Sequence, residues 1–186
     1  MKSVRVNPAH ILKYGCICYL LLLLIGCTPA PLTAQQPQKP RQQPTAIADR
    51  VVVEKSKHQL HLQSRGQIIR SYQIALGPNP QGHKQRESDG RTPEGIYRID
   101  YRNPRSAYHR SLHISYPASA DRQRAAAVGD NPGSDIMIHG LGTSFAAIGK
   151  LHTAKDWTLG CIAVTNDEIE EIWKLVPNGT IIEIKP

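Results

Sequence analysis

Cys161 is the residue of this sequence whose side chain is best suited to act as a nucleophile. The chain contains four cysteines, of which Cys16 and Cys18 lie in an apolar N-terminal stretch and Cys27 follows that stretch directly. If the stretch directs export and Cys27 is modified, Cys161 is the one unpaired thiol left in an oxidising compartment. Such a cysteine is either buried and inert, or it is kept unpaired because its sulfur reacts.

The sequence also supplies candidate bases for this thiol. A cysteine has an ordinary pKa of about 8.5, so it needs a base to take its proton or a cation to hold the thiolate. His139 is the first candidate, because it ends an apolar segment, precedes Gly140 and stands 22 positions before Cys161. His152, nine positions before Cys161, is the second. Structural roles are predicted for the domain's other histidines, which are His58, His61, His83, His109 and His113.

The N-terminus has the pattern of an export signal. Three basic residues and no acid precede an apolar run over residues 17–25, which is shorter than the roughly 20 residues of a membrane-spanning helix. The run ends in Gly26-Cys27 and resembles the lipobox of bacterial lipoproteins. This resemblance implies removal of residues 1–26 and acylation of Cys27 as a lipid anchor. The expected location is the periplasmic face of a membrane. Thr28 in place of an aspartate favours the outer membrane over the inner one.

The rest of the chain divides into a tether and one domain. Residues 27–48 are rich in Pro and Gln, a composition that cannot bury a core and favours extended chain. Residues 49–186 are enough for one domain with a real core. The formal charge is +8, and the three basic residues of the signal leave +5 for the remainder. Because export is predicted, we expect no nucleic-acid partner; a basic surface would suit anionic cell-wall peptides.

The residue pattern of the domain predicts mainly short strands. These are expected at residues 51–54, 59–62, 68–74, 95–99, 112–116, 135–138 and 180–184. One helix is expected over residues 119–128. A second helix should begin after Thr165, because Thr165 and Glu168 have the spacing of a capping box and Val164 can form a hydrophobic staple with Ile169. Its apolar face would contain Ile169, Ile172, Trp173 and Val176.

The segments around Cys161 resemble the L,D-transpeptidase catalytic domain, often called YkuD-type. The hallmark of that family is a His-Gly or His-Ser pair, a variable loop, and Ser/Thr-His-Gly-Cys followed by an apolar residue. The corresponding residues here are His139-Gly140 and Thr158-Leu159-Gly160-Cys161-Ile162. The sequence Asp-Gly-Arg-Thr-Pro-Glu-Gly-Ile-Tyr at residues 89–97 is also similar to the family. Residues 112–117 and 156–158 resemble a Gram-negative subgroup of it. The resemblance covers about residues 50–185.

The resemblance implies a mostly β, sandwich-like fold with a few short helices, and a cysteine acyl-enzyme. Cys161 would attack the diaminopimelate carbonyl of a tetrapeptide stem of peptidoglycan, release D-Ala and form a thioester. An amine would then resolve it, giving a 3-3 cross-link or attaching a wall-bound lipoprotein. His139 would act as base and then acid, the Gly140 carbonyl would orient His139, and N–H groups at Gly160 and Cys161 would hold the oxyanion. This mechanism requires neither a metal nor a cofactor.

Two positions depart from the family pattern. Leu159 stands where many members have a second histidine, and Ala163 stands near the place of an arginine or asparagine. We therefore expect His152 to supply an imidazole from the preceding loop and Arg91 to bind a substrate carboxylate. Thr158 is expected to contact the substrate.

Three alternatives remain open on the sequence alone. Water could resolve the thioester, which would make the protein an L,D-carboxypeptidase or another hydrolase on the same scaffold. The chain could also be a non-catalytic wall-binding lipoprotein with a structural Cys161. A zinc site from His139, His152 and Cys161 has suitable ligand types, but its spacing matches no common zinc pattern.

Overall fold

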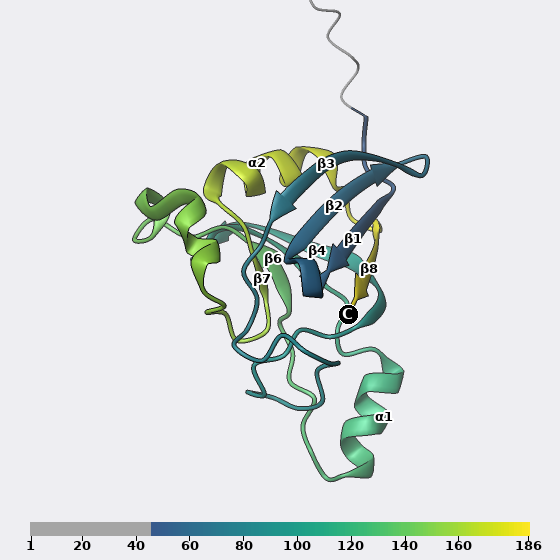
Figure 1. The fold of residues 1–186 in the computed structure, drawn as a ribbon. Coiled ribbons are helices and arrows are strands. Elements are labelled where there is room, and N and C mark those ends of the chain that lie inside the picture. The colour runs from purple at the N-terminus through teal and green to yellow at the C-terminus, as the bar shows by residue number, and fades with distance from the viewer. Residues whose placement is uncertain (1–45) are drawn as a thin grey trace, which may run out of the picture. The chain divides into compact units, whose positions relative to one another are not determined.

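The structure is a computed structural model that describes residues 46–186, and it is mostly β (Figure 1). Its strands are β1 (Arg50–Glu54), β2 (Gln59–Ser64), β3 (Gln67–Gln73), β4 (Gly95–Ser106), β5 (His109–Ile114), β6 (Met137–His139), β7 (Ile162–Ala163) and β8 (Ile181–Lys185). Its helices are α1 (Ser119–Ala127) and α2 (Asn166–Leu175), with short 3-10 segments η1 (Lys55–Lys57) and η2 (Ala146–Ala154).

The predicted export signal, Cys27 and most of the predicted tether lie outside the described residues. Within residues 46–186, the structure contains no helix that is both long enough and apolar enough to cross a bilayer.

The strands form one sheet in the order β3-β2-β1-β8-β4-β5-β6-β7. β1 pairs with β8 and β6 pairs with β7 in parallel, and all the other neighbours are antiparallel. The sheet curls until its ends meet, because the chain after β3 returns to β7. There Ala75 and Ala163 exchange backbone hydrogen bonds of 3.1 and 2.9 Å. The predicted mostly β fold with few helices is confirmed, as one strongly curled sheet.

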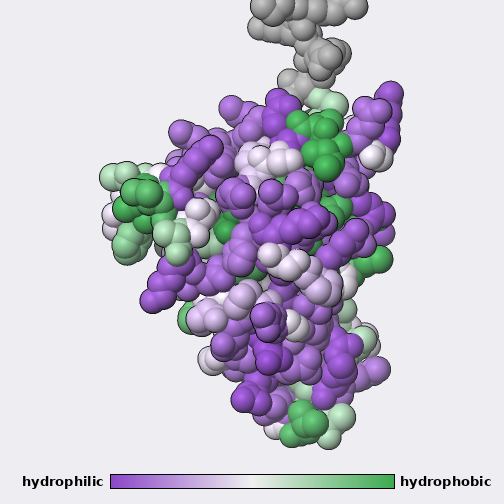
Figure 2. Space-filling model, in the orientation of Figure 1, coloured by the Kyte–Doolittle hydropathy of each residue, from purple (hydrophilic) through white to green (hydrophobic). Residues whose placement is uncertain are grey.

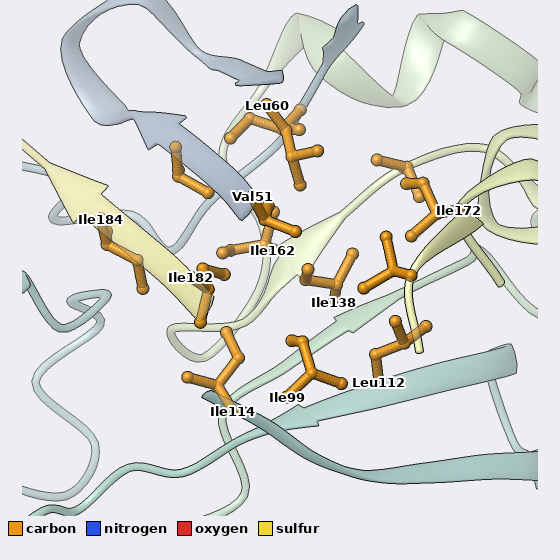
Figure 3. Close-up of a cluster of buried hydrophobic side chains, with 14 of the residues drawn as sticks. Val51, Leu60, Ile99, Leu112, Ile114, Ile138, Ile162, Ile172, Ile182 and Ile184 are labelled. Atoms are coloured by element: carbon orange, nitrogen blue, oxygen red, sulfur yellow. The ribbon is translucent and has the colours of Figure 1, made fainter. Parts of the chain in front are cut away.

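Period-two alternation decides which face of β8 is buried. In β8, Ile182 and Ile184 are buried, whereas Glu183 and Lys185 are more exposed. Figure 3 shows both isoleucines in a cluster with Val51 of β1 and Ile162 of β7. Full burial of such a side chain contributes about 1.5–3 kcal/mol. The apolar residues of this curled sheet thus hold β7, and the Cys161 segment before it, against the core.

Helix α2 begins where the capping-box pattern predicts. The Glu168 N–H donates to the Thr165 hydroxyl oxygen at 3.3 Å, and the Thr165 N–H donates to a Glu168 carboxylate oxygen at 2.9 Å. Such a cap stabilises a helix by about 1 kcal/mol. Ile169 and Ile172 are buried, and α2 covers the sheet from above in Figure 1. Because α2 starts five residues after Cys161, the cap also fixes the chain that leaves β7.

Trp173 was expected in the core and is only partly buried against it. The guanidinium carbons of Arg102 and Arg110 lie 4.0 and 4.7 Å from its ring centroid. Trp173 therefore links α2 to the β4–β5 hairpin through cation–π contacts with Arg102 and Arg110.

The main differences from the predicted elements concern β4, β5, β7 and η2. β4 continues to Ser106 instead of ending near Ile99, and β5 begins at His109. The extension was missed because most of it is exposed and shows no alternation, and because it contains Pro104, a residue uncommon inside strands. β7 has only two residues, and η2 contains the kink residue Gly149, so neither gave a periodic signal.

Candidate active site

Strands β6 and β7 bring His139 and Cys161 to one cavity. Ile138 lies opposite Ile162, and His139 lies opposite Ala163. Cys161 stands directly before β7, two residues before Ala163. His139 and Cys161 both line a cavity of about 340 Å³. The other lining residues are Lys84, Glu87, Ser88, Tyr108, Gly133, Ser134, Asp135, Ile136, Trp157, Thr158 and Leu159.

The His139 ring is oriented by a hydrogen bond to the next residue, Gly140. It is only 4% exposed, and its Nδ1 donates to the Gly140 carbonyl at 2.6 Å. This bond places the proton on Nδ1 and leaves Nε2 as an acceptor. Burial lowers the pKa of His139; a nearby His152 charge lowers it further, and the bond to Gly140 opposes both. The imidazole is therefore neutral at neutral pH and able to accept a proton.

Gly140 is required by close packing. A Cβ at this position would lie 2.6 Å from Oδ1 of Asn166 and 2.9 Å from the Tyr108 carbonyl oxygen. The same Asn166 oxygen accepts the Leu141 N–H at 2.8 Å, which ties the first turn of α2 to the segment after His139. The backbone carbonyl that orients His139 is thus fixed from two sides.

Two aromatic rings pack against His139. The Tyr108 ring centroid is 4.5 Å from that of His139, and the Trp157 centroid is 5.8 Å away in an edge-to-face arrangement. Trp157 belongs to the segment singled out in the sequence, but Tyr108 does not. Tyr108 comes from the turn between β4 and β5, and no sequence pattern placed that turn beside Cys161. The rings restrict the imidazole to one orientation.

The Cys161 thiol is partly exposed at the cavity wall and is not in a disulfide. Its Sγ lies 3.4 Å from the Asp135 carbonyl oxygen, within reach for an S–H donor. Burial raises the pKa of the Cys161 thiol. A backbone hydrogen bond from Met137 and the positive charge of Lys84 lower the pKa, and the Asp135 charge raises it. The thiol form therefore predominates at neutral pH.

The loop before Cys161 is closed by its own hydrogen bonds. The Thr158 hydroxyl donates to the Cys161 carbonyl at 2.7 Å and accepts the Gly160 N–H at 3.2 Å. The Thr92 hydroxyl donates to the Gly160 carbonyl at 2.8 Å. Gly160 has a φ of +121°, and a Cβ there would lie 2.5 Å from the Arg91 carbonyl oxygen. Only glycine fits this position.

These bonds bear on two of the predicted roles. Because Gly160 gives its N–H to Thr158, the structure does not support that N–H as an oxyanion donor. Thr158 is buried, and its hydroxyl is used inside the loop rather than offered to a substrate. Both residues shape the Cys161 segment, although Thr158 also lines the cavity.

Arg91 and His152 do not line the cavity that contains Cys161; each lines a different pocket. Arg91 lines a hollow of about 390 Å³ with Asn79, Gln85, Arg86, Ser88 and Asp89, and only Ser88 is shared with the cavity. His152 lines an apolar pocket of about 280 Å³ that shares Trp157 with the cavity. Neither residue therefore lines the Cys161 cavity as the sequence led us to expect.

The pocket of His152 opens on an exposed apolar surface. Figure 2 shows a hydrophobic group at the left, where η2 lies in Figure 1. Phe145, Ile148 and Leu151 are 57%, 42% and 77% exposed. His152 itself is buried, and within the described residues neither ring nitrogen has a hydrogen-bond partner.

The described residues, 46–186, contain no group of three or more His, Cys, Asp or Glu side chains arranged to hold a metal ion. The zinc alternative also needs His152 beside His139 and Cys161, and the structure places His152 in a separate pocket.

The two residues that depart from the family pattern differ in exposure. Leu159 is 80% exposed at the cavity rim. Ala163 is fully buried and pairs with Ala75.

Lys84 is a cavity residue that sequence reasoning missed. It is 4% exposed and forms an ion pair of 2.9 Å with Asp89. A buried lysine is unusual enough to attract notice in a structure. In the sequence it stands in a polar loop, and nothing there distinguishes it from a solvated lysine.

Known proteins match this chain over its described part. The family model for the L,D-transpeptidase catalytic domain, YkuD, matches residues 48–184. The Escherichia coli K12 protein named "Putative L,D-transpeptidase YafK" is 30% identical over 117 residues, which are 62% of this chain and 40% of that protein.

Two solved structures share the fold. The helical cell shape determining protein Pgp2 (K307A mutant) of Campylobacter jejuni has a TM-score of 0.57 and 24% identity, covering 75% of this chain and 48% of that one. Bd1075 of Bdellovibrio bacteriovorus has a TM-score of 0.50 and 24% identity, covering 75% and 51%. This chain thus spans 40–51% of the length of these three relatives.

The curled, mostly β sheet and the family match agree on one class of domain. The chain belongs to the L,D-transpeptidase catalytic domain family.

Proposed function

We propose that this protein is a peptidoglycan L,D-transpeptidase whose nucleophile is Cys161. The proposal is supported most by one arrangement: a neutral imidazole, with its Nδ1 proton bonded to the Gly140 carbonyl, shares one cavity with the only cysteine of the described residues. The donor would be a tetrapeptide stem, and the acceptor would be an amine of a second stem or of a wall-attached lipoprotein. Family membership supports the reaction class, and the cavity supports the roles of the residues.

In the first half-reaction, Nε2 of His139 takes the Cys161 proton and the sulfur attacks the diaminopimelate carbonyl carbon. The tetrahedral intermediate places a negative charge on the carbonyl oxygen. We assign its stabilisation to the Cys161 N–H, since the Gly160 N–H is bonded to Thr158. The intermediate collapses as the C–N bond to D-Ala breaks, and His139 gives its proton to the leaving amine. The product is a thioester on Cys161.

In the second half-reaction, an acceptor amine attacks the thioester carbonyl. His139 takes a proton from the amine and returns it to the sulfur when the C–S bond breaks. Glu87 and Asp135 are exposed residues of the same cavity and carry charge suited to an incoming ammonium group. An amide bond has formed and the free thiol is restored, so the cycle needs no cofactor.

The reaction can be tested with purified disaccharide-tetrapeptides. Cross-linked dimers together with released D-Ala are the expected products by mass spectrometry. Tripeptides without dimers would show a hydrolase in which water resolves the thioester. An unchanged substrate in the presence of folded protein would contradict the proposal and favour a wall-binding protein.

We also propose that the domain works at a membrane surface through a lipid on Cys27. The support is the lipobox-like sequence alone, because Cys27 lies outside the described residues. The full chain should appear in the membrane fraction with an acylated N-terminal peptide, and Cys27→Ala should abolish the acylation. A wild-type chain that is unmodified and soluble in the periplasm would contradict the anchor.

A further inference from the structure

The loop between β3 and β4 and the nearby η1 segment each bury one lysine. Lys55 is 2% exposed and Lys84 is 4% exposed. Each ammonium pairs with a carboxylate at 2.9 Å, Lys55 with Glu94 and Lys84 with Asp89. Burial of a cation is unfavourable unless the surrounding groups compensate for it. The two residues differ in position, because Lys84 lines the Cys161 cavity and Lys55 is not among the residues that line it.

The Lys84 ammonium has two oxygen acceptors. Its Nζ donates to the Arg86 carbonyl at 3.1 Å and to Oδ1 of Asp89 at 2.9 Å. Burial opposes the ionised form of Asp89, but hydrogen bonds from Gln85, Lys84, Arg91 and Arg86 lower the pKa of that carboxyl overall. The carboxylate charge is thus shared among three backbone N–H groups as well as Lys84. Of this buried ion pair, Lys84 is the member that lines the cavity.

The other charged groups of the cavity are less well placed to act on the sulfur. Asp135 and Glu87 are exposed, and water screens their charges. The Asp135 carboxylate also accepts a hydrogen bond from Ser134 at 2.9 Å, and Glu87 accepts one from Asn131 at 3.1 Å. His139 is neutral at neutral pH because burial lowers its pKa. Lys84 is therefore the buried charge in the cavity, and buried charges act over longer distances than exposed ones.

We propose that Lys84 is a positioning residue for the nucleophile, and that its buried ammonium stabilises the Cys161 thiolate electrostatically. The inference rests on the proposed role of Cys161 and adds a cation that complements His139. It explains how a thiol whose pKa is raised by burial remains reactive. His139 supplies the proton acceptor, and Lys84 supplies the compensating charge.

The test is the pH dependence of Cys161 alkylation in the full chain, without any substrate. Iodoacetamide reacts with the thiolate by displacement of iodide, and mass spectrometry of the peptide containing Cys161 separates it from the other cysteines. Lys84→Met should slow alkylation at pH 7 on the order of tenfold and move the midpoint to higher pH. Lys84→Arg should retain the wild-type profile because it keeps the charge.

Lys55→Met is the matched control, because it removes a buried, paired lysine that does not line the cavity. It should lower the melting temperature and leave the alkylation profile unchanged. If Lys84→Met does not fold, as judged by circular dichroism, Lys84→Gln is the second neutral variant, since its amide can still donate to Asp89. Equal profiles for wild type and a folded neutral Lys84 variant would overturn the proposal. Because no turnover is measured, this result is independent of whether the protein is a transpeptidase.

Discussion

His139 and His152 are equally buried, at 4% exposure each, but their surroundings differ. His139 has a hydrogen bond to the Gly140 carbonyl, two aromatic rings against it and a thiol in the same cavity. His152 has no partner for either ring nitrogen within the described residues and lines an apolar pocket. Burial alone therefore does not mark a catalytic histidine. The proposed role of His139 rests instead on the bond that fixes its tautomer and on the thiol in the same cavity.

The two histidines should differ most in how much their replacement by alanine lowers the cross-linking activity. His139→Ala should lower kcat/KM for cross-linking by about 10²–10⁴-fold, the usual contribution of a general base. His152→Ala should have a much smaller effect, because that ring does not line the cavity. Both rates can be measured from released D-Ala. A larger loss for His152→Ala would show that we assigned the base to the wrong residue.

Replacing each of the two histidines by leucine should change the free energy of unfolding in opposite directions. His152→Leu replaces an unpartnered polar ring in an apolar pocket, so it should raise the free energy of unfolding by about 1 kcal/mol. His139→Leu breaks the bond to Gly140 and should lower it. Urea denaturation followed by circular dichroism measures both changes. A destabilised His152→Leu protein would mean that the ring has a partner, such as a bound water.

The smallest expected effect is on the pH profile. Neutral His139 is the active form and burial lowers its pKa, so the acid limb of kcat/KM should lie below the ordinary histidine value of about 6.5. A charge on His152 also lowers the His139 pKa, so the limb should move slightly to higher pH in His152→Leu. A wild-type limb above 6.5 would contradict a buried neutral base.

The sequence predicted the parts of the site that are close together along the chain. His139-Gly140 and Gly160-Cys161 were recognised from their motif, and the structure places His139 and Cys161 at one cavity. Thr165 and Glu168 predicted the start of α2, because a capping box is a local pattern. Such features depend on neighbouring residues and can be read directly.

The parts that were missed depend on how the sheet curls. Tyr108 and Lys84 reach the cavity from the β4–β5 turn and from the loop before β4, and both are far from Cys161 in sequence. The Gly160 N–H, which was expected to hold the oxyanion, is bonded to the Thr158 hydroxyl, because Thr158 turns back onto its own loop. Arg91 was assigned to the substrate, but its carbonyl oxygen packs against Gly160 while its side chain lines another hollow. These outcomes depend on side-chain direction, which no pattern along the chain fixes.

The acyl-enzyme is the most direct test of the central claim that Cys161 reacts beside His139. Wild-type protein incubated with a tetrapeptide stem and no added acceptor should release D-Ala and carry the remaining tripeptide on the peptide that contains Cys161. The adduct should be absent in Cys161→Ala and form much more slowly in His139→Ala, with both variants folded. D-Ala released at the wild-type rate by Cys161→Ala, or an adduct on another residue, would contradict the account.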